Sequence, residues 1–158
     1  MSKQKAAEIR SQLKTLGYTS RDVSVRSDHN SLDVTIRRSG LNVAAIKRIA
    51  NSFENIRRCE ASGEILSGGN TFVFVRFSDD VRDAVAAQVR VAADAAGLQT
   101  KGWARFTIGK HEYEISTDRP QVRVVLCGSD GIGTNLGGML WSIDQAVDAI
   151  VNHNLSAE

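Results

Sequence analysis

Apolar side chains recur every three or four residues in four stretches of the chain, and this spacing predicts four amphipathic helices. They cover residues 3–16, 42–53, 79 or 80 to 96, and about 142–154. Asn42 and Ser142 can cap the second and the last helix, because their side chains accept a hydrogen bond from a free N–H of the first turn. Gly17 and Gly97 stand where helix-ending glycines belong. The third helix is expected to bury a side formed by Val81, Ala84, Val85, Ala92 and Ala96.

Alternating or β-branched residues predict seven strands, at residues 23–26, 32–37, 56–60, 71–77, 103–108, 111–116 and 121–127. The polar loop 27–31 joins the first two strands, and Gly109-Lys110 joins the fifth and sixth in a tight hairpin. The order predicts an α+β fold: residues 1–97 form an antiparallel sheet with helices on one face, α-β-β-α-β-β-α. Residues 98–158 form a small β-β-β-α unit that packs on this domain.

The strand at residues 71–77 carries large apolar groups on both faces, and the functional interpretation depends on it. Side chains alternate along a strand, so Phe72, Phe74 and Arg76 share one face while the intervening residues point to the other. The strand is therefore either a central one that is covered on both sides, or one with an open working face. If the C-terminal unit covers this face, Phe72 and Phe74 become core residues.

Composition indicates a soluble protein, since 42% of the 158 residues are hydrophobic and no stretch has the character of a membrane span or a secretory signal. We expect it in the cytoplasm. The charge is uneven: residues 1–60 hold 12 Lys and Arg against 6 Asp and Glu, and residues 61–158 hold 8 against 12. The basic half can face an acidic partner or nucleic acid.

Arginines recur on the predicted strands of this basic half. Arg26, Arg37 and Arg76, with Arg57 or Arg58, form a basic patch if these strands are neighbours, and such a patch suits phosphates or an acidic protein surface. The alternative is an ordinary polar sheet face on which Asp33, Thr35 and Glu60 are cross-strand partners.

Residues 70–77 also match part of an RNA-recognition signature, in which aromatic residues two apart on a strand stack on unpaired bases. Phe72 and Phe74 fit this signature, whereas Asn70, Thr71 and Val73 do not. A central strand buried on both faces is the alternative.

Two glycine-containing loops are further candidates for binding. In the loop 61–70, Glu64 and Asn70 can either bond the loop to itself or contact a partner, and Ile65 and Leu66 favour packing of its middle on the core. The loop 128–138 follows a strand and precedes a helix, but its glycine spacing fails the dinucleotide pattern. A mobile loop, or one ordered by a protein partner, is the better interpretation.

Motifs of known catalytic or metal chemistry are missing from the sequence, which favours binding over catalysis. His29, His111 and His153 are isolated along the chain, and Cys59 and Cys127 form no metal-ligand or disulfide pattern. We predict no catalytic residue, no metal and no cofactor, although a catalytic site assembled from distant residues stays open. The oligomeric state is not predicted.

Three segments, LGYTSRDVSVRSDHNSLDVTIR, NVAAIKRIANSF and EASGEILSGGNTFVFVRF, together resemble the family called large polyvalent protein associated domain 29, over about residues 10–78. That family occurs in proteins carried by phages and conjugative elements and has no assigned catalytic residues to carry over. The resemblance implies a counter-defence protein in the cytoplasm of a bacterial host, which binds a host protein or a protein–nucleic-acid complex. The alternative from the residues is a single-stranded nucleic-acid binder that uses Phe72, Phe74 and the flanking arginines.

Overall fold

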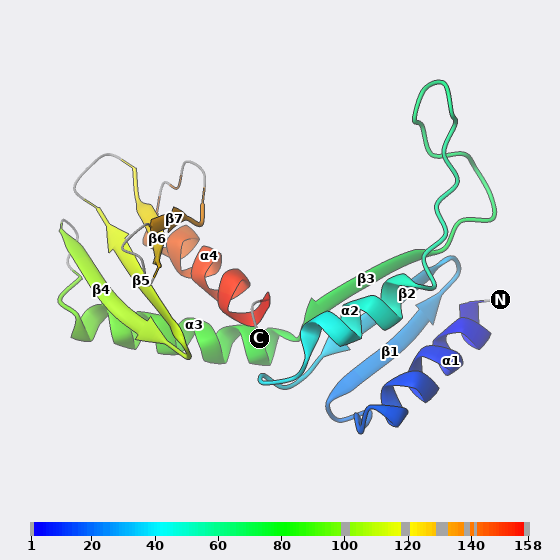
Figure 1. Cartoon of the computed structure of the whole chain (residues 1–158), viewed down its shortest axis with the longest axis horizontal. Coiled ribbons are helices and arrows are strands. Elements are labelled where there is room, and N and C mark those ends of the chain that lie inside the picture. Colours follow the sequence, from blue (N-terminus) through cyan, green and yellow to red (C-terminus); the bar gives the residue numbers. More distant parts are fainter. Residues whose placement is uncertain are drawn as a thin grey trace. The chain divides into compact units, whose positions relative to one another are not determined.

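The computed structural model describes residues 2–98, 102–117, 121–128, 133–137, 140 and 142–156. It confirms the predicted α+β class, with helices and two separate sheets (Figure 1). The chain divides into two compact units, unit 1 (Met1–Val81) and unit 2 (Arg82–Glu158). Most of the third helix therefore belongs to unit 2, whereas the sequence placed it in the first domain. Among the helices of the described segments, none has the length and apolar character needed to cross a membrane.

Unit 1 is built from α1 (Ser2–Thr15), β1 (Val23–Asp28), β2 (Ser31–Ile36), α2 (Val43–Asn51) and β3 (Phe72–Phe77). Its sheet has the order β1-β2-β3. The hairpin between β1 and β2 turns at His29 and Asn30 alone, so it is tighter than predicted.

The pairing of β3 corrects the predicted antiparallel sheet, because β3 runs parallel to β2. The connection from β2 passes through α2 and returns to the end of the sheet at which β2 begins, so β3 starts beside Ser31 and follows the same direction. The sheet of unit 1 is therefore mixed.

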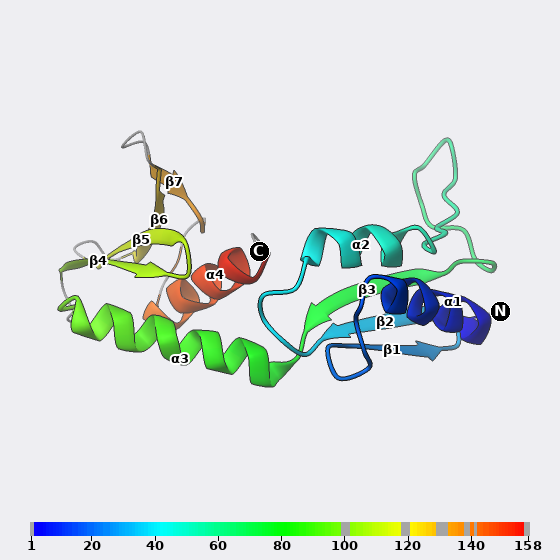
Figure 2. The same ribbon diagram turned by 60° about the horizontal axis from the view of Figure 1, so that its bottom comes forward.

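Both helices of unit 1 lie on the same side of its sheet (Figure 2). The core between the helices and the sheet consists of Ala6, Ile9 and Leu13 of α1, alternate residues of β1 and β2, and Val43, Ile46 and Ala50 of α2. From β3, Val73, Val75 and Phe77 pack against this core. The alternation of β3 thus places its other three side chains on the opposite face of the sheet.

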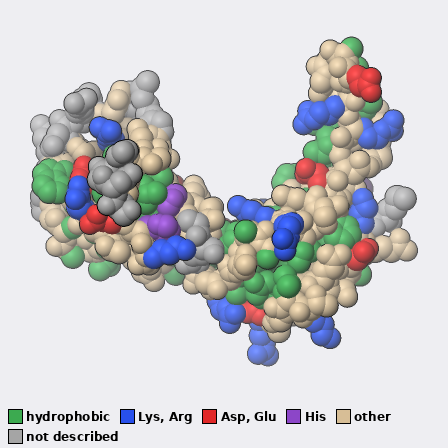
Figure 3. Space-filling view, viewed as in Figure 1, with side chains coloured by type: hydrophobic (Ala, Val, Ile, Leu, Met, Phe, Trp, Pro, Cys, Tyr) green, Lys and Arg blue, Asp and Glu red, His purple; other side chains and the backbone are tan. Residues whose placement is uncertain are grey.

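The predicted strand at residues 56–60 does not form. Residues 55–71 instead make an arm that rises away from the sheet (Figures 1 and 3). Asn55 and Thr71 exchange two backbone hydrogen bonds of 2.9 and 2.7 Å at its root, and Arg58 and Ile65 form an isolated bridge further out. The predicted strand is absent for two reasons. The charged side chains of Arg57 and Arg58 favour solvent over a core, and no strand of the described chain lies beside this segment to pair with it.

Unit 2 contains most of α3 (Asp79–Ala95), then β4 (Trp103–Ile108), β5 (His111–Ser116), β6 (Arg123–Cys127), β7 (Gly133–Asn135) and α4 (Ile143–Ser156). Its antiparallel sheet has the order β4-β5-β6-β7. The predicted hairpin at Gly109-Lys110 and the Ser142 cap, which accepts a hydrogen bond from Gln145 N–H at 3.2 Å, are both confirmed. Three residues of the predicted loop 128–138 pair with β6 as β7, and residues 129–132 and 138 of that loop lie outside the described residues.

Helices α3 and α4 run beside each other in opposite directions within unit 2. Arg82 donates to Asn152 at 2.7 Å and Arg90 donates to Asp144 at 2.9 Å, so the start of one helix lies beside the end of the other. The buried side of α3 is Val81, Val85, Val89 and Ala93. The predicted burial of Ala84 and Ala96 is wrong, since the apolar stripe follows the larger valines at a spacing of four.

Candidate functional site on the open sheet face

The side of the unit 1 sheet opposite α1 and α2 is the candidate site, here called the open face. It carries alternate residues of each strand: Ser24, Arg26 and Asp28 of β1, Ser31, Asp33 and Thr35 of β2, and Phe72, Phe74 and Arg76 of β3. Among the described residues of unit 1, no helix or strand covers this face. Within unit 1, β3 therefore has one face in the core and one face that no described element of the unit covers, and it is an outer strand of the described sheet.

Strand register sets which side chains meet on the open face. Arg26, Asp33 and Phe74 form one row across the three strands, and Ser24, Thr35 and Arg76 form the next. Arg76 Nη2 lies 3.1 Å from Asp33 Oδ1, so it forms an ion pair diagonally between the rows. Arg26 and Arg37 form no ion pair with any described residue.

A shallow depression of about 650 Å³ runs over this face to the start of α3. Its charged lining consists of three arginines, Arg26, Arg37 and Arg76, and four aspartates, Asp28, Asp33, Asp79 and Asp80. The predicted convergence of the three arginines is confirmed, but the surface is a mixed-charge one and not a basic patch.

The remaining arginines of the predicted patch lie elsewhere. Arg58 donates from Nη1 to the carbonyl of Gly63 at 3.2 Å within the arm, and the Arg57 side chain lies against Gly69. Neither lines the depression. They were expected beside the other arginines only because residues 56–60 were predicted to be a strand. Glu60, the expected cross-strand partner, lies on the arm with them.

The two aromatic side chains of β3 share the open face, as the alternation predicts. The exposed fraction of Phe74 is 52%, and Phe72 is half-buried. Phe74 is thus a large exposed apolar side chain next to charged residues, Asp33 on β2 and Arg76 on β3, and exposed aromatic side chains of this kind are frequent in binding surfaces.

The loop within the arm bonds mainly to itself. Asn70 accepts from Arg57 N–H at 2.8 Å and donates to Leu66 C=O at 2.7 Å, and the Glu64 carbonyl accepts from Cys59 N–H at 2.8 Å. Asn70 therefore braces the two sides of the arm. The expected packing of Ile65 and Leu66 on the core is wrong, because their exposed fractions are 47% and 39%.

Unit 2 contains a cluster of titratable side chains that the sequence did not reveal. The rings of His111 and His153 lie 5.0 Å apart, and Tyr113 Oη is 3.0 Å from His153 Nδ1. Burial lowers the pKa of His153, with a smaller contribution from His111, and burial raises the pKa of Tyr113. His111 Nε2 is buried and has no hydrogen-bond partner among the described residues. The histidines are far apart in sequence, so only the folding of α4 onto β5 brings them together.

The described residues include no group of three His, Cys, Asp or Glu side chains arranged to hold a metal ion. Both cysteines are free thiols.

Comparison with known proteins gives no assignment, since the chain matches no family model, no curated protein and no solved structure at a significant level. The resemblance stated for residues 10–78 stays a prediction.

Proposed function

We propose that this chain is a binding protein of a phage or another mobile element, which acts against host defence by binding a host protein or a protein–nucleic-acid complex in the bacterial cytoplasm. The observation that supports binding is the open face, where the exposed Phe74 lies beside Asp33 of β2 and two residues from Arg76 on the same strand. The mobile-element origin, the action against host defence and the bacterial cytoplasm are proposed from the family resemblance of residues 10–78.

The charge balance of the depression favours a protein partner over a polyanion. Four aspartates would repel the phosphates of a bound strand, whereas a mixture of arginines and aspartates beside an exposed aromatic side chain matches the polar rim of a protein interface. Arg26 and Arg37, which form no ion pair with a described residue, are available for carboxylates of the partner.

The test is an affinity pull-down from the bacterial host with the tagged full chain, repeated after nuclease treatment and at raised salt. We expect wild type and Trp103→Ala to retain the same host protein, and Phe74→Ala to lose it. Trp103 is the matched control because it is an aromatic residue of unit 2 with an exposed fraction of 62%. Because about half of the Phe74 side chain is exposed, Phe74→Ala should lower the free energy of unfolding by about 1 kcal/mol and leave unit 1 folded. Equal retention by Phe74→Ala contradicts the proposal.

The second candidate function is single-stranded nucleic-acid binding, and the common face of Phe72, Phe74 and Arg76 favours it. Stacking of a base on an aromatic side chain contributes about 1–3 kcal/mol. This candidate predicts binding of labelled oligonucleotides that weakens steeply with salt and weakens further in Phe74→Ala. If Phe74→Ala binds oligonucleotides as tightly as wild type, this candidate is wrong.

A further inference from the structure

The outer edge of β1 presents main-chain groups that no described strand pairs with, because β2 is the one strand paired with β1 among the described residues. Arg37 N–H donates to the carbonyl of its register neighbour Asp22 at 2.8 Å. Asp22 and Arg37 are thus a hydrogen-bonded pair, and such pairs involve every second residue of an antiparallel ladder. The main-chain N–H and C=O groups of the intervening residues, Val23, Val25 and Ser27, therefore point away from β2.

Two contacts agree with this direction. Val23 N–H donates to Thr19 C=O at 3.0 Å, and Val25 C=O accepts from Arg10 Nη2 at 2.6 Å. Arg10 thus occupies Val25 C=O. The N–H of Val25 and the N–H and C=O of Ser27 remain on the edge, with no described strand beside them.

A groove of about 440 Å³ follows this edge between β1 and the second half of α1. Leu13, Tyr18, Val23 and Val25 supply its apolar lining. An extended segment lying along the edge would place every second side chain over this lining.

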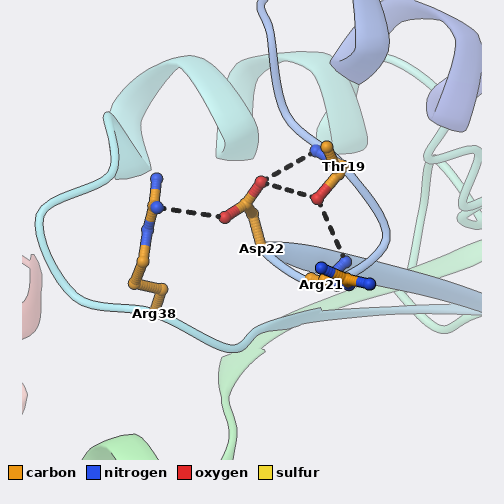
Figure 4. Close-up of polar contacts among 4 residues, drawn as sticks. All are labelled: Thr19, Arg21, Asp22 and Arg38. Carbon is orange, nitrogen blue, oxygen red and sulfur yellow. Dashed lines mark hydrogen bonds and ion pairs between the residues drawn. The ribbon is translucent and has the colours of Figure 1, made fainter.

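Four cations, Arg10, Lys14, Arg26 and Arg37, also line the groove, and no Asp or Glu is among its lining residues. None of the four forms an ion pair with a residue that the structure describes. Asp22, the acidic residue of the turn before β1, is engaged elsewhere (Figure 4): it accepts from Thr19 N–H at 2.9 Å and from Thr19 Oγ1 at 2.8 Å, and it pairs with Arg38 at 3.4 Å. The groove is therefore complementary to negative charge.

We propose that the outer edge of β1 binds an extended acidic peptide of a partner protein as an added strand. The N–H of Val25 and the N–H and C=O of Ser27 bond the peptide main chain, and the apolar side chains of the peptide enter the groove. Its carboxylates alternate to the other face of the added strand, where Arg26 and Arg37 lie. The groove shares these two arginines with the depression of the open face but does not include Phe74, and the proposal does not depend on the function proposed for the open face.

The test uses the full chain and a short fluorescein-labelled peptide of alternating glutamate and valine. Fluorescence anisotropy should show binding at least about tenfold tighter than that of the same peptide with lysine in place of glutamate. A peptide with N-methylated valines, which lacks main-chain donors on one edge, should bind more weakly.

In NMR spectra, the glutamate peptide should shift the amide signals of Val25 and Ser27. Absence of binding, equal binding of the lysine peptide, or unshifted amides at both positions would overturn the proposal.

Variants of the protein test the contacts between its cations and the peptide carboxylates. The double variant Arg26→Gln/Arg37→Gln should bind the glutamate peptide about tenfold more weakly. The matched control Arg48→Gln/Arg58→Gln loses the same charge outside the groove and should bind as wild type does. Phe74→Ala should also keep peptide binding, so a failure of this proposal and a failure of the open face are distinguishable. Equal weakening in the control would mean that net charge alone attracts the peptide, and would overturn the proposal.

Discussion

Cys59 and Cys127 are both free thiols, but their surroundings move their pKa values in opposite directions. Hydrogen bonds from the Ser62 side chain and from the backbone N–H groups of Ser62 and Ala61 lower the pKa of Cys59. Burial raises the pKa of Cys127. Because the thiolate is the reactive form, iodoacetamide should modify Cys59 first near neutral pH. Mass spectrometry of peptides taken at successive times measures the two rates.

The variant Ser62→Ala is the matched control for this difference, since it removes the hydroxyl donor and keeps the backbone donors. It should slow alkylation of Cys59 and leave Cys127 unchanged. Faster modification of Cys127 in wild type would show that the hydrogen bonds do not govern reactivity.

His153 should make unit 2 less stable in acid. Its pKa in the folded chain is lowered by burial and by His111, whereas unfolding returns it to about 6.5. The unfolded chain therefore binds more protons in the window below that value, and stability falls as the pH drops from about 6.5 toward the folded pKa. The free energy of unfolding of unit 2 in the full chain is measured at several pH values by urea titration, with the protection of unit 2 amides against exchange as the signal. His153→Gln should flatten the dependence, and the exposed His29→Gln should not.

The arm is an element with its own hydrogen bonds and almost no share in the core. Asn70→Ala removes the acceptor for Arg57 N–H and the donor to Leu66 C=O. Amide hydrogen exchange should become faster at Arg57, while exchange in β1 and β2 stays the same because their core contacts are untouched. Asn70→Asp keeps an acceptor for Arg57 N–H and should preserve its protection. Faster exchange throughout unit 1 would mean that the arm supports the sheet.

Helix ends and hairpins could be predicted from the sequence because their signals are local. Asn42 accepts from Ala45 N–H at 2.9 Å at the start of α2, and Gly109 has a φ of 59° at the turn between β4 and β5. Each depends on a few neighbouring residues. The same locality explains why the shared face of Phe72, Phe74 and Arg76 was predictable.

Features that depend on the path of the chain through space could not be predicted. The parallel direction of β3 follows from where the long connection ends, and no residue pattern within β3 encodes it. Which face of the unit 1 sheet becomes the core depends on where α1 and α2 pack. The contact between His111 and His153 likewise needs the docking of α4 on the sheet.

For the chain as a whole, the described core of unit 1 is formed by residues of unit 1 alone. Leu32→Ala, at a fully buried position, should lower the stability of unit 1 by about 2–5 kcal/mol. Hydrogen exchange should accelerate in β1, β2 and β3, and we expect protection in β5 to be unchanged. Equal acceleration in β5 would show that the two units unfold as one.

The hydrogen bonds at the root of the arm affect how far the sequence of the arm can vary. Asn55 and Thr71 hold the two ends of the arm together by a pair of backbone hydrogen bonds, and the register of β3 is set by its pairing with β2. Insertions, deletions or grafted sequences between these two residues therefore need not disturb the sheet. The arm is a position at which the chain can acquire a new recognition segment while keeping its fold.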